Sequence, residues 1–239
     1  MKIYRYNIIQ EFIDVLSKTK KINYLEIGVR DGDCFLKIKA DKKLAIDPNF
    51  VISKSKKVKT LFRNSSNFRN KYFEATSDDF FEKKSEMLAE IGGVDVVFID
   101  GLHQYEQVMR DVQNSLKILN KNGVILMHDC NPTFAAAAVR GSSPQEIAEN
   151  PPEGWTGEWN GDVWKCIVNL RSMRDDLEIL VYDCDYGIGQ VRKGKPDSML
   201  TFSLEEIDKM DYSDLEKNRQ YLLNLKAGDE YINYIKANL

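Results

Sequence analysis

The sequence predicts an α/β fold with a doubly wound, mostly parallel sheet of seven strands. Over the first 130 residues, short β-rich apolar runs alternate with segments of helical spacing, the pattern of a parallel sheet covered by helices. Two further runs, at residues 177–182 and 187–191, are separated by only a few residues. Because so short a connection cannot cross over the sheet, we expect this terminal pair to be antiparallel.

The first half of the chain is expected to supply five strands and most of the helices. Residues 9–16 have apolar positions at helical spacing and predict an opening amphipathic helix. The predicted strands cover residues 22–27, 43–47, 72–75, 94–99 and 124–127. The predicted helices start after Gly32, cover residues 78–91 and include residues 108–119.

Residues 131–161 interrupt this alternation. They contain four prolines and several glycines with weak periodicity, so we predict an active-site lid or acceptor-binding insertion. Regular structure resumes with a helix near residues 162–174, and residues 203–239 read as a helical extension packed outside the sheet or against a second subunit. Residues 1–239 are therefore expected to form one domain, with a homo-oligomer left open.

The amino-acid composition limits the classes of partner that we expect for this chain. The chain has 43% hydrophobic and 30% charged residues, with 34 Lys and Arg against 37 Asp and Glu, a balance without the basic surface expected of a nucleic-acid enzyme. No apolar run has the length of a membrane span or the form of a signal peptide. The four cysteines form no CxxC pair, so we expect reduced thiols in a cytoplasmic protein with no membrane or nucleic-acid partner.

A glycine-containing loop follows the first strand and marks a ligand site. Gly28 and Gly32 allow close approach of backbone to a ligand, and the helix expected after them would offer unpaired N–H groups. Asp47 lies 21 residues after Glu26, at the end of the second strand, where a carboxylate can accept hydrogen bonds from ribose hydroxyls. The alternative is that Asp47 only opens the turn before Pro48. The ligand is thus expected to contain a nucleoside, as a dinucleotide or S-adenosylmethionine (SAM).

Two features favour SAM. A dinucleotide loop needs G-x-G-x-x-G to hold a pyrophosphate, whereas Arg30 stands at the second glycine position. Glu26 places at the strand end a carboxylate that repels pyrophosphate but attracts the ammonium of a methionine moiety. The terminal antiparallel pair is the second feature, because an ordinary dinucleotide fold lacks it.

The motif Glu26-x-Gly28-x-Arg30-x-Gly32 resembles the first motif of class I SAM-dependent methyltransferases, with one glycine replaced. Asp100-Gly101-Leu102-His103-Gln104-Tyr105 and His128-Asp129 resemble a narrower group, the family that includes sugar and macrolide-glycoside O-methyltransferases and cephalosporin hydroxylase relatives. The resemblance extends from about residue 24 to residue 191. It implies a Rossmann-like fold and methyl transfer from SAM.

The resemblance also implies roles by position. Glu26, Gly28 and Gly32 would hold the methionine end of the cofactor, and Asp47 the ribose. Ser77 and Asp78 would lie beside the adenine. Asp100 would close the fourth strand, within reach of the cofactor.

Asp100 and Asp129 end the fourth and fifth strands and should meet at the carboxyl edge of the sheet. Two carboxylates there can hold Mg²⁺, which prefers oxygen ligands. The flanking His128 and Cys130 are not typical magnesium ligands. We therefore also expect the alternative, in which the two aspartates bind cofactor, cap helices or pair with cations.

Methyl transfer to a hydroxyl requires in-line alignment and benefits from proton removal. His103, just past the fourth strand, is the predicted base, with Asp100 or a bound metal as alternative activators. Trp155 and Trp159 are candidates to stack on a sugar ring, whereas Trp164 is expected in the core.

The sequence therefore predicts a SAM-dependent methyltransferase that acts on oxygen of a small molecule or glycan. The alternatives are an NAD-dependent oxidoreductase or epimerase, and a non-catalytic cofactor-binding relative.

Overall fold

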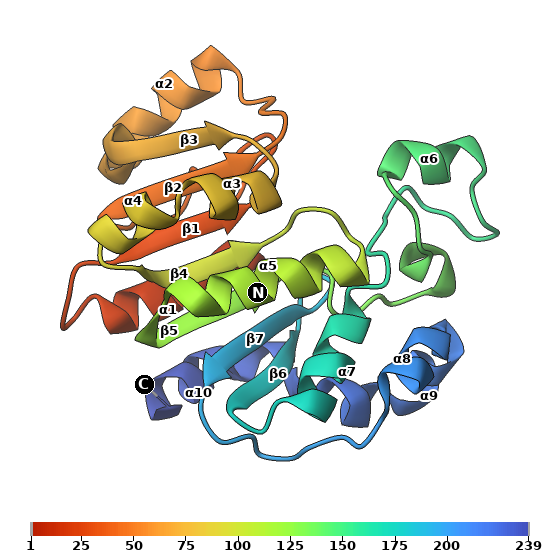
Figure 1. Cartoon of the computed structure of the whole chain (residues 1–239). Coiled ribbons are helices and arrows are strands. Elements are labelled where there is room, and N and C mark those ends of the chain that lie inside the picture. Colours follow the sequence, from red (N-terminus) through yellow and green to blue (C-terminus); the bar gives the residue numbers. More distant parts are fainter. Residues whose placement is uncertain (1, 239) are drawn as a thin grey trace.

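The computed structural model describes residues 2–238 as one mixed sheet covered by helices on both faces (Figure 1). The sheet has the strand order β3-β2-β1-β4-β5-β7-β6-β8. Its strands are β1 (Asn23–Ile27), β2 (Lys42–Asp47), β3 (Asn70–Glu74), β4 (Val94–Ile99), β5 (Leu119–Met127), β6 (Leu177–Asp183), β7 (Ile188–Lys193) and β8 (Leu225–Ala227). The first five strands are mutually parallel, and β7 runs antiparallel to both of its neighbours. The predicted fold class is confirmed.

One strand was not predicted. β8 adds to the edge of the sheet by pairing in parallel with β6, within the tail that we expected to be entirely helical. Asn224 ends the preceding helix in a left-handed conformation (φ 47°), and its side chain donates a hydrogen bond to the carbonyl of Ile179 on β6. This turn directs three residues along the open edge of β6 before the chain returns to a helix.

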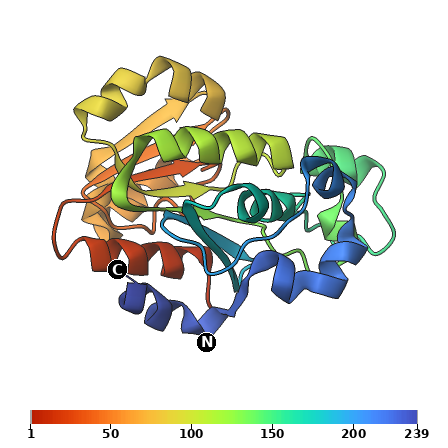
Figure 2. The same ribbon diagram turned by 60° about the horizontal axis from the view of Figure 1, so that its bottom comes forward.

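Helices cover the two faces unequally. One face carries α3 (Ser77–Lys83), α4 (Ser85–Glu90), α5 (Tyr105–Ile118) and α7 (Trp164–Met173), and the other carries α1 (Arg5–Leu16) and α10 (Tyr231–Asn238), which lie side by side (Figure 2). The remaining helices are α2 (Lys54–Arg63), α6 (Pro144–Glu149), α8 (Leu204–Lys209), α9 (Tyr212–Leu223) and the 3₁₀ turns η1 (Ser65–Arg69), η2 (Ala135–Ala138) and η3 (Gly228–Glu230). The carboxyl-terminal helices contribute Ile207, Leu215 and Ile235 to the buried core. They therefore pack on the helices that cover the sheet, α8 and α9 against α7 and α10 against α1.

The β4 strand shows why the central strands could be predicted from the sequence. All six of its residues are buried, because helices cover both faces and leave no polar side to alternate with the apolar one. None of the described helices is long and apolar enough to cross a membrane.

Candidate functional site

A cavity of about 1090 Å³ opens at the carboxyl edge of the parallel strands, where ligands bind in doubly wound folds. Its walls come from the loops after β1, β2, β3 and β4, the end of β5, the β6–β7 turn, the start of the chain, and residues 142–145 and 158–160. Eight of the nine residues predicted for the site line it: Glu26, Gly28, Asp47, Ser77, Asp78, Asp100, His103 and Asp129. Gly32 is the exception.

Glu26 is a buried carboxyl group whose pKa is shifted by its surroundings. The side chain is 1% exposed, and the Tyr24 hydroxyl donates a hydrogen bond to its carboxylate. Burial raises the pKa of Glu26 to about 7, against the opposing effect of the Tyr24 hydrogen bond. At neutral pH this carboxyl group is thus poised between its two protonation states, and a bound cation would favour the ionised form.

Gly28 allows the loops after β1 and β4 to meet. Its φ is +85°, and a Cβ there would lie 1.9 Å from the carbonyl oxygen of Asp100. Only glycine fits this contact. The close approach brings Glu26 and Asp100 to the same cavity.

The helix expected after Gly32 does not form, which corrects the sequence prediction. Residues 30–37 make turns instead, and side chains from distant positions donate to carbonyls at the end of this segment. Lys43 Nζ donates to the carbonyls of Phe35 (2.5 Å) and Ile38 (2.8 Å), and Asn64 Nδ2 donates to those of Leu36 and Ile38. No helix start therefore supplies N–H groups at this wall, and Gly32 (φ +78°) serves the turn behind it.

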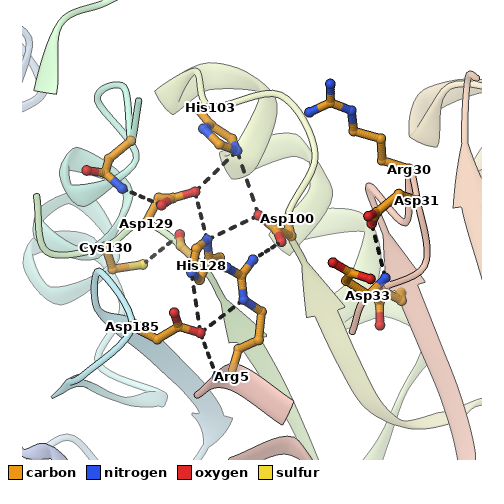
Figure 3. Close-up of polar contacts among 12 residues, drawn as sticks. Arg5, Arg30, Asp31, Asp33, Asp100, His103, His128, Asp129, Cys130 and Asp185 are labelled. Atoms are coloured by element: carbon orange, nitrogen blue, oxygen red, sulfur yellow. Dashed lines mark hydrogen bonds and ion pairs between the residues drawn. The ribbon is translucent and has the colours of Figure 1, made fainter. Parts of the chain in front are cut away.

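Asp47 is held in place by backbone donors. The amide of Arg30 donates to Oδ2 and the amide of Asn49 to Oδ1, each at 2.7 Å. A carboxylate oxygen has a second lone pair, so both oxygens can still accept from a ligand hydroxyl. Arg30 itself adopts a left-handed conformation (φ 45°) at the place of the missing glycine, and Figure 3 shows its side chain extended away from Asp31 and Asp33.

Ser77 and Asp78 form the cavity wall at the start of α3. Gln107 Nε2 donates to Ser77 Oγ (3.2 Å), while Asp78 is half-exposed and pairs with Arg110 (3.4 Å). Their predicted place beside an adenine stays a prediction.

Two aspartates and two histidines meet at the ends of β4 and β5 (Figure 3). Asp129 Oδ2 lies 2.9 Å from His128 Nδ1 and 3.2 Å from His103 Nε2. Asp100 Oδ1 lies 3.2 Å from His128 Nδ1 and 3.7 Å from His103 Nε2. Asp129 adopts φ 60°, a conformation that aspartate tolerates better than most residues.

Sequence reasoning missed two further members of this group. Arg5, at the start of α1, contacts Asp100 Oδ2 through NH1 (2.6 Å) and Asp185 Oδ2 through Nε (3.0 Å). Asp185, in the β6–β7 turn, lies 3.9 Å from His128 Nε2. We call Arg5, Asp100, His103, His128, Asp129 and Asp185 the charge cluster.

The cluster balances its own charge. Burial opposes protonation of both histidines, but Asp129 and Asp100 outweigh it and raise the pKa of His103 to about 9 and that of His128 to about 10. Burial also disfavours the ionised aspartates, yet the histidines hold the pKa of Asp100 and Asp129 below the ordinary value. At neutral pH three cations therefore face three carboxylates.

A backbone contact orients His103. Its Nδ1 lies 2.8 Å from the carbonyl oxygen of Trp159, which can only accept, so Nδ1 carries a proton. The atom left to exchange a proton is Nε2, on the side of Asp129. Trp159 also packs its ring 5.0 Å from that of His103, whereas Trp155 does not line the cavity and Trp164 is buried in the core as expected.

The donor set suits a hard cation. Asp100, His103 and Asp129 each offer a ligand atom within 4.8 Å of the others. Asn160 Oδ1 is buried without a hydrogen-bond partner, and the Asn160 amide nitrogen donates to Asp129 Oδ1. Carboxylates are ligands that Mg²⁺ prefers, and protons of both histidines point at the same carboxylate oxygens.

Comparison with known proteins identifies the central part of the chain. Residues 25–130 match the family model described as "Methyltransferase domain". An uncharacterized protein, R132, of Acanthamoeba polyphaga mimivirus is 28% identical over 131 residues, which span 52% of this chain and 58% of that protein. The match thus covers less than two thirds of the curated relative.

Solved structures match a larger part of the fold. Cofactor-bound Rv0187 from MTB aligns over 82% of this chain and 83% of its own, with a TM-score of 0.53 and 12% identity. The SAH-bound methyltransferase PaMTH1 of Podospora anserina aligns over 77% of this chain and 76% of its own, with a TM-score of 0.49 and 18% identity.

Proposed function

We propose that this chain, whose residues 25–130 form a methyltransferase domain on a class I SAM-dependent fold, is an O-methyltransferase of a small molecule or glycan. One observation carries the proposal. A single cavity has carboxylates free to receive a ligand at one end and a proton-exchanging cluster at the other. The first end suits the methyl donor and the second suits a hydroxyl acceptor.

The residues of the first end fit SAM. When bound, SAM supplies an electrophilic methyl group. Glu26 binds the methionine ammonium, Asp47 accepts from the ribose hydroxyls, and Ser77 with Asp78 borders the adenine. Gly28 keeps the loop close enough for these contacts.

The same residues argue against NAD. A pyrophosphate would have to approach Glu26 and Asp47 where the expected helix start is missing and supplies no dipole or free N–H groups. Arg30, at the position of the second glycine, has its amide already bonded to Asp47. An oxidoreductase would need a phosphate-binding loop that residues 28–41 do not form.

At the second end, His103 Nε2 accepts the proton of the acceptor hydroxyl. Its pKa of about 9 leaves about one ring in a hundred neutral at pH 7, so kcat should rise with pH toward about 9. Asp100 orients the ring, and its own low pKa makes it a weaker base than His103.

Asp100 and Asp129 would hold Mg²⁺ if the enzyme uses it. The ion would stabilise negative charge on an acceptor oxygen. Because it would compete with the histidine protons, its affinity should rise with pH and its binding should release protons.

The acceptor class rests on the resemblance to sugar O-methyltransferases and on the cavity size. About 1090 Å³ exceeds the roughly 300–1,000 Å³ of sites that hold one small ligand, which leaves room for a second molecule. Residues 142–145 and Trp159 line the cavity and support the predicted lid. Four unpaired cysteines, three of them buried, support a reducing compartment such as the cytoplasm.

The test is calorimetric titration with SAM, its demethylated product and NAD, each with and without Mg²⁺. We expect both sulfur compounds to bind and NAD to give no heat. Binding of NAD alone would overturn the proposal. A non-catalytic relative is distinguished by Asp129→Asn, which should abolish turnover of an active enzyme while SAM binding persists.

A further inference from the structure

Helix α2 lies at the outer edge of the molecule, beyond β3 (Figure 1). It is the one described helix of ten residues or more whose residues are all at least partly exposed. A helix that contributes nothing to the core usually presents a polar surface. This helix does not.

Four large apolar side chains are exposed on and around it. Val58 is 55% exposed and Phe62 is 87% exposed, and their spacing of four residues places them on one face of α2. Phe68, in η1, is 70% exposed, and Val51, just before α2, is 54% exposed. We call Val51, Val58, Phe62 and Phe68 the α2 patch.

Cations border this patch. On the helix, Lys54 projects from one side of the Val58–Phe62 face and Lys59 with Arg63 from the other, and all three are exposed. The two remaining lysines of α2 point inward, Lys56 toward Asp33 and Lys57 over the Tyr72 ring. The outward face is thus apolar at its centre and basic at both margins.

The charged residues of the segment around α2 are all basic. Residues 48–73 contain seven Lys and Arg and no Asp or Glu, although the chain as a whole has a net charge of −3. The segment therefore attracts an anionic surface that the rest of the molecule would repel.

We propose that the α2 patch docks the protein on an anionic lipid surface. A helix with an apolar face between basic margins lies in the membrane interface, with the apolar side chains among the acyl chains and the cations at the headgroups. No spanning helix is needed for this contact. The aliphatic Val51 and Val58 favour lipid over nucleic acid, because valine offers no face on which a base can stack.

The patch also borders the cavity. Val51 belongs to both, so docking would place the cavity mouth beside the lipid headgroups. The inference does not depend on the proposed methyl transfer, because the full chain can be tested for binding without any substrate.

The test is co-sedimentation of the protein with vesicles of phosphatidylcholine alone and of phosphatidylcholine with phosphatidylglycerol. We expect binding to the mixed vesicles only, weakening as salt shortens the Debye length. The triple variant Lys54→Gln, Lys59→Gln, Arg63→Gln should bind about a hundredfold more weakly, at about fivefold per cation. The double variant Val58→Ser, Phe62→Ser should lose at least about tenfold.

Matched controls keep the result specific. Leu204 is exposed to a similar extent (53%) on α8, so Leu204→Ser should bind as the wild type. Lys121→Gln with Lys195→Gln removes two exposed charges elsewhere and should change binding by less than twofold. Thermal unfolding of every variant checks that the fold is intact.

Three results would overturn the proposal. The wild type fails to bind mixed vesicles, or both α2 variants bind them as well as the wild type does. The third is that the wild type binds a fluorescent single-stranded oligonucleotide, or forms a dimer that the Phe62 variant dissociates, in place of binding vesicles.

Discussion

The two ends of the cavity treat buried charge in opposite ways. At the end formed by β1 and β2, Glu26 and Asp47 have hydroxyl and amide partners but no cation in contact. At the other end, the charge cluster brings three cations against three carboxylates. The first end therefore leaves its charge for a ligand to neutralise, whereas the second is already neutral as folded. Substitutions should then affect binding at one end and folding or catalysis at the other.

The largest expected effect tests the catalytic half of this comparison. His103→Gln should lower kcat by about 10²–10⁴-fold, because a positioned base contributes about that much, while the Kd for SAM changes by less than about twofold. In the wild type, kcat should rise between about pH 7 and pH 9 as His103 loses its proton, and this slope should vanish in the variant. Rate profiles by methyl-transfer assay check both. A variant that loses SAM binding as much as kcat would remove the distinction between the two ends.

Arg5→Gln should give the next largest effect, on stability. The substitution leaves Asp100 and Asp185 without their shared cation, and breaking a largely buried pair costs about 3 kcal/mol. Urea denaturation measures the loss. The control is Arg174→Gln, whose ion pair with Asp176 is exposed on both sides and should cost less than about 1 kcal/mol. Equal losses of unfolding free energy in the two variants would show that burial does not strengthen the ion pairs of Arg5.

Glu26→Gln should act in the opposite direction. A carboxyl group with a pKa of about 7 in the folded state and about 4.5 in the unfolded state keeps a proton on folding between these pH values, so wild-type stability falls as pH rises through that window. The glutamine variant has no such group. It should be more stable than the wild type by up to about 3 kcal/mol above pH 7 and equally stable below about pH 4.5.

The same variant should bind SAM about 10–100-fold more weakly at pH 8, since it loses a charged hydrogen-bond partner. Wild-type affinity should decline below about pH 7 as Glu26 is protonated, and the variant should lack this dependence. Titration calorimetry across pH measures both. The control is Glu216→Gln, which removes an exposed carboxylate on α9. Unchanged affinity in Glu26→Gln would remove this residue from the cofactor site.

The smallest effect is expected at Asp78. Its carboxylate is half-exposed, and so is Arg110, with which it forms an ion pair. Asp78→Ala should therefore weaken SAM binding by less than about fivefold. A larger loss, measured by the same titration, would mean that SAM depends on the wall at α3 as well as on the buried carboxylates of Glu26 and Asp47.

The sequence predicted those parts of the site that follow from strand ends. Asp47, Asp100 and Asp129 each come directly at or after a buried parallel strand, and parallel strands end at one edge, so their convergence did not depend on side-chain detail. Arg5 and Asp185 lie outside that rule. Arg5 precedes an ordinary amphipathic helix, and Asp185 sits in a turn between antiparallel strands, so only the folded chain brings either to Asp100 or His128.

The missing helix after Gly32 shows a second limit. A helix was expected there to follow the glycine loop, but Lys43 and Asn64 supply donors from distant positions to carbonyls of this segment. Tertiary partners thus replaced the intrahelical ones. A buried lysine in the second strand was the available signal, because its three donors require acceptors nearby.

The ends of the segment over residues 141–161 are held by other parts of the chain, whereas the stretch around Gly154 and Gly157 is open. A Cβ on Gly161 would lie 1.9 Å from the carbonyl oxygen of His103, and the Gly141 carbonyl accepts a hydrogen bond from Gln104 Nε2 (2.9 Å). Gly154 and Gly157 have nothing within 4 Å. For protein engineering, residues 150–157 are a tolerant insertion site: libraries that vary them and keep both end glycines should leave Trp159 and the cavity wall in place.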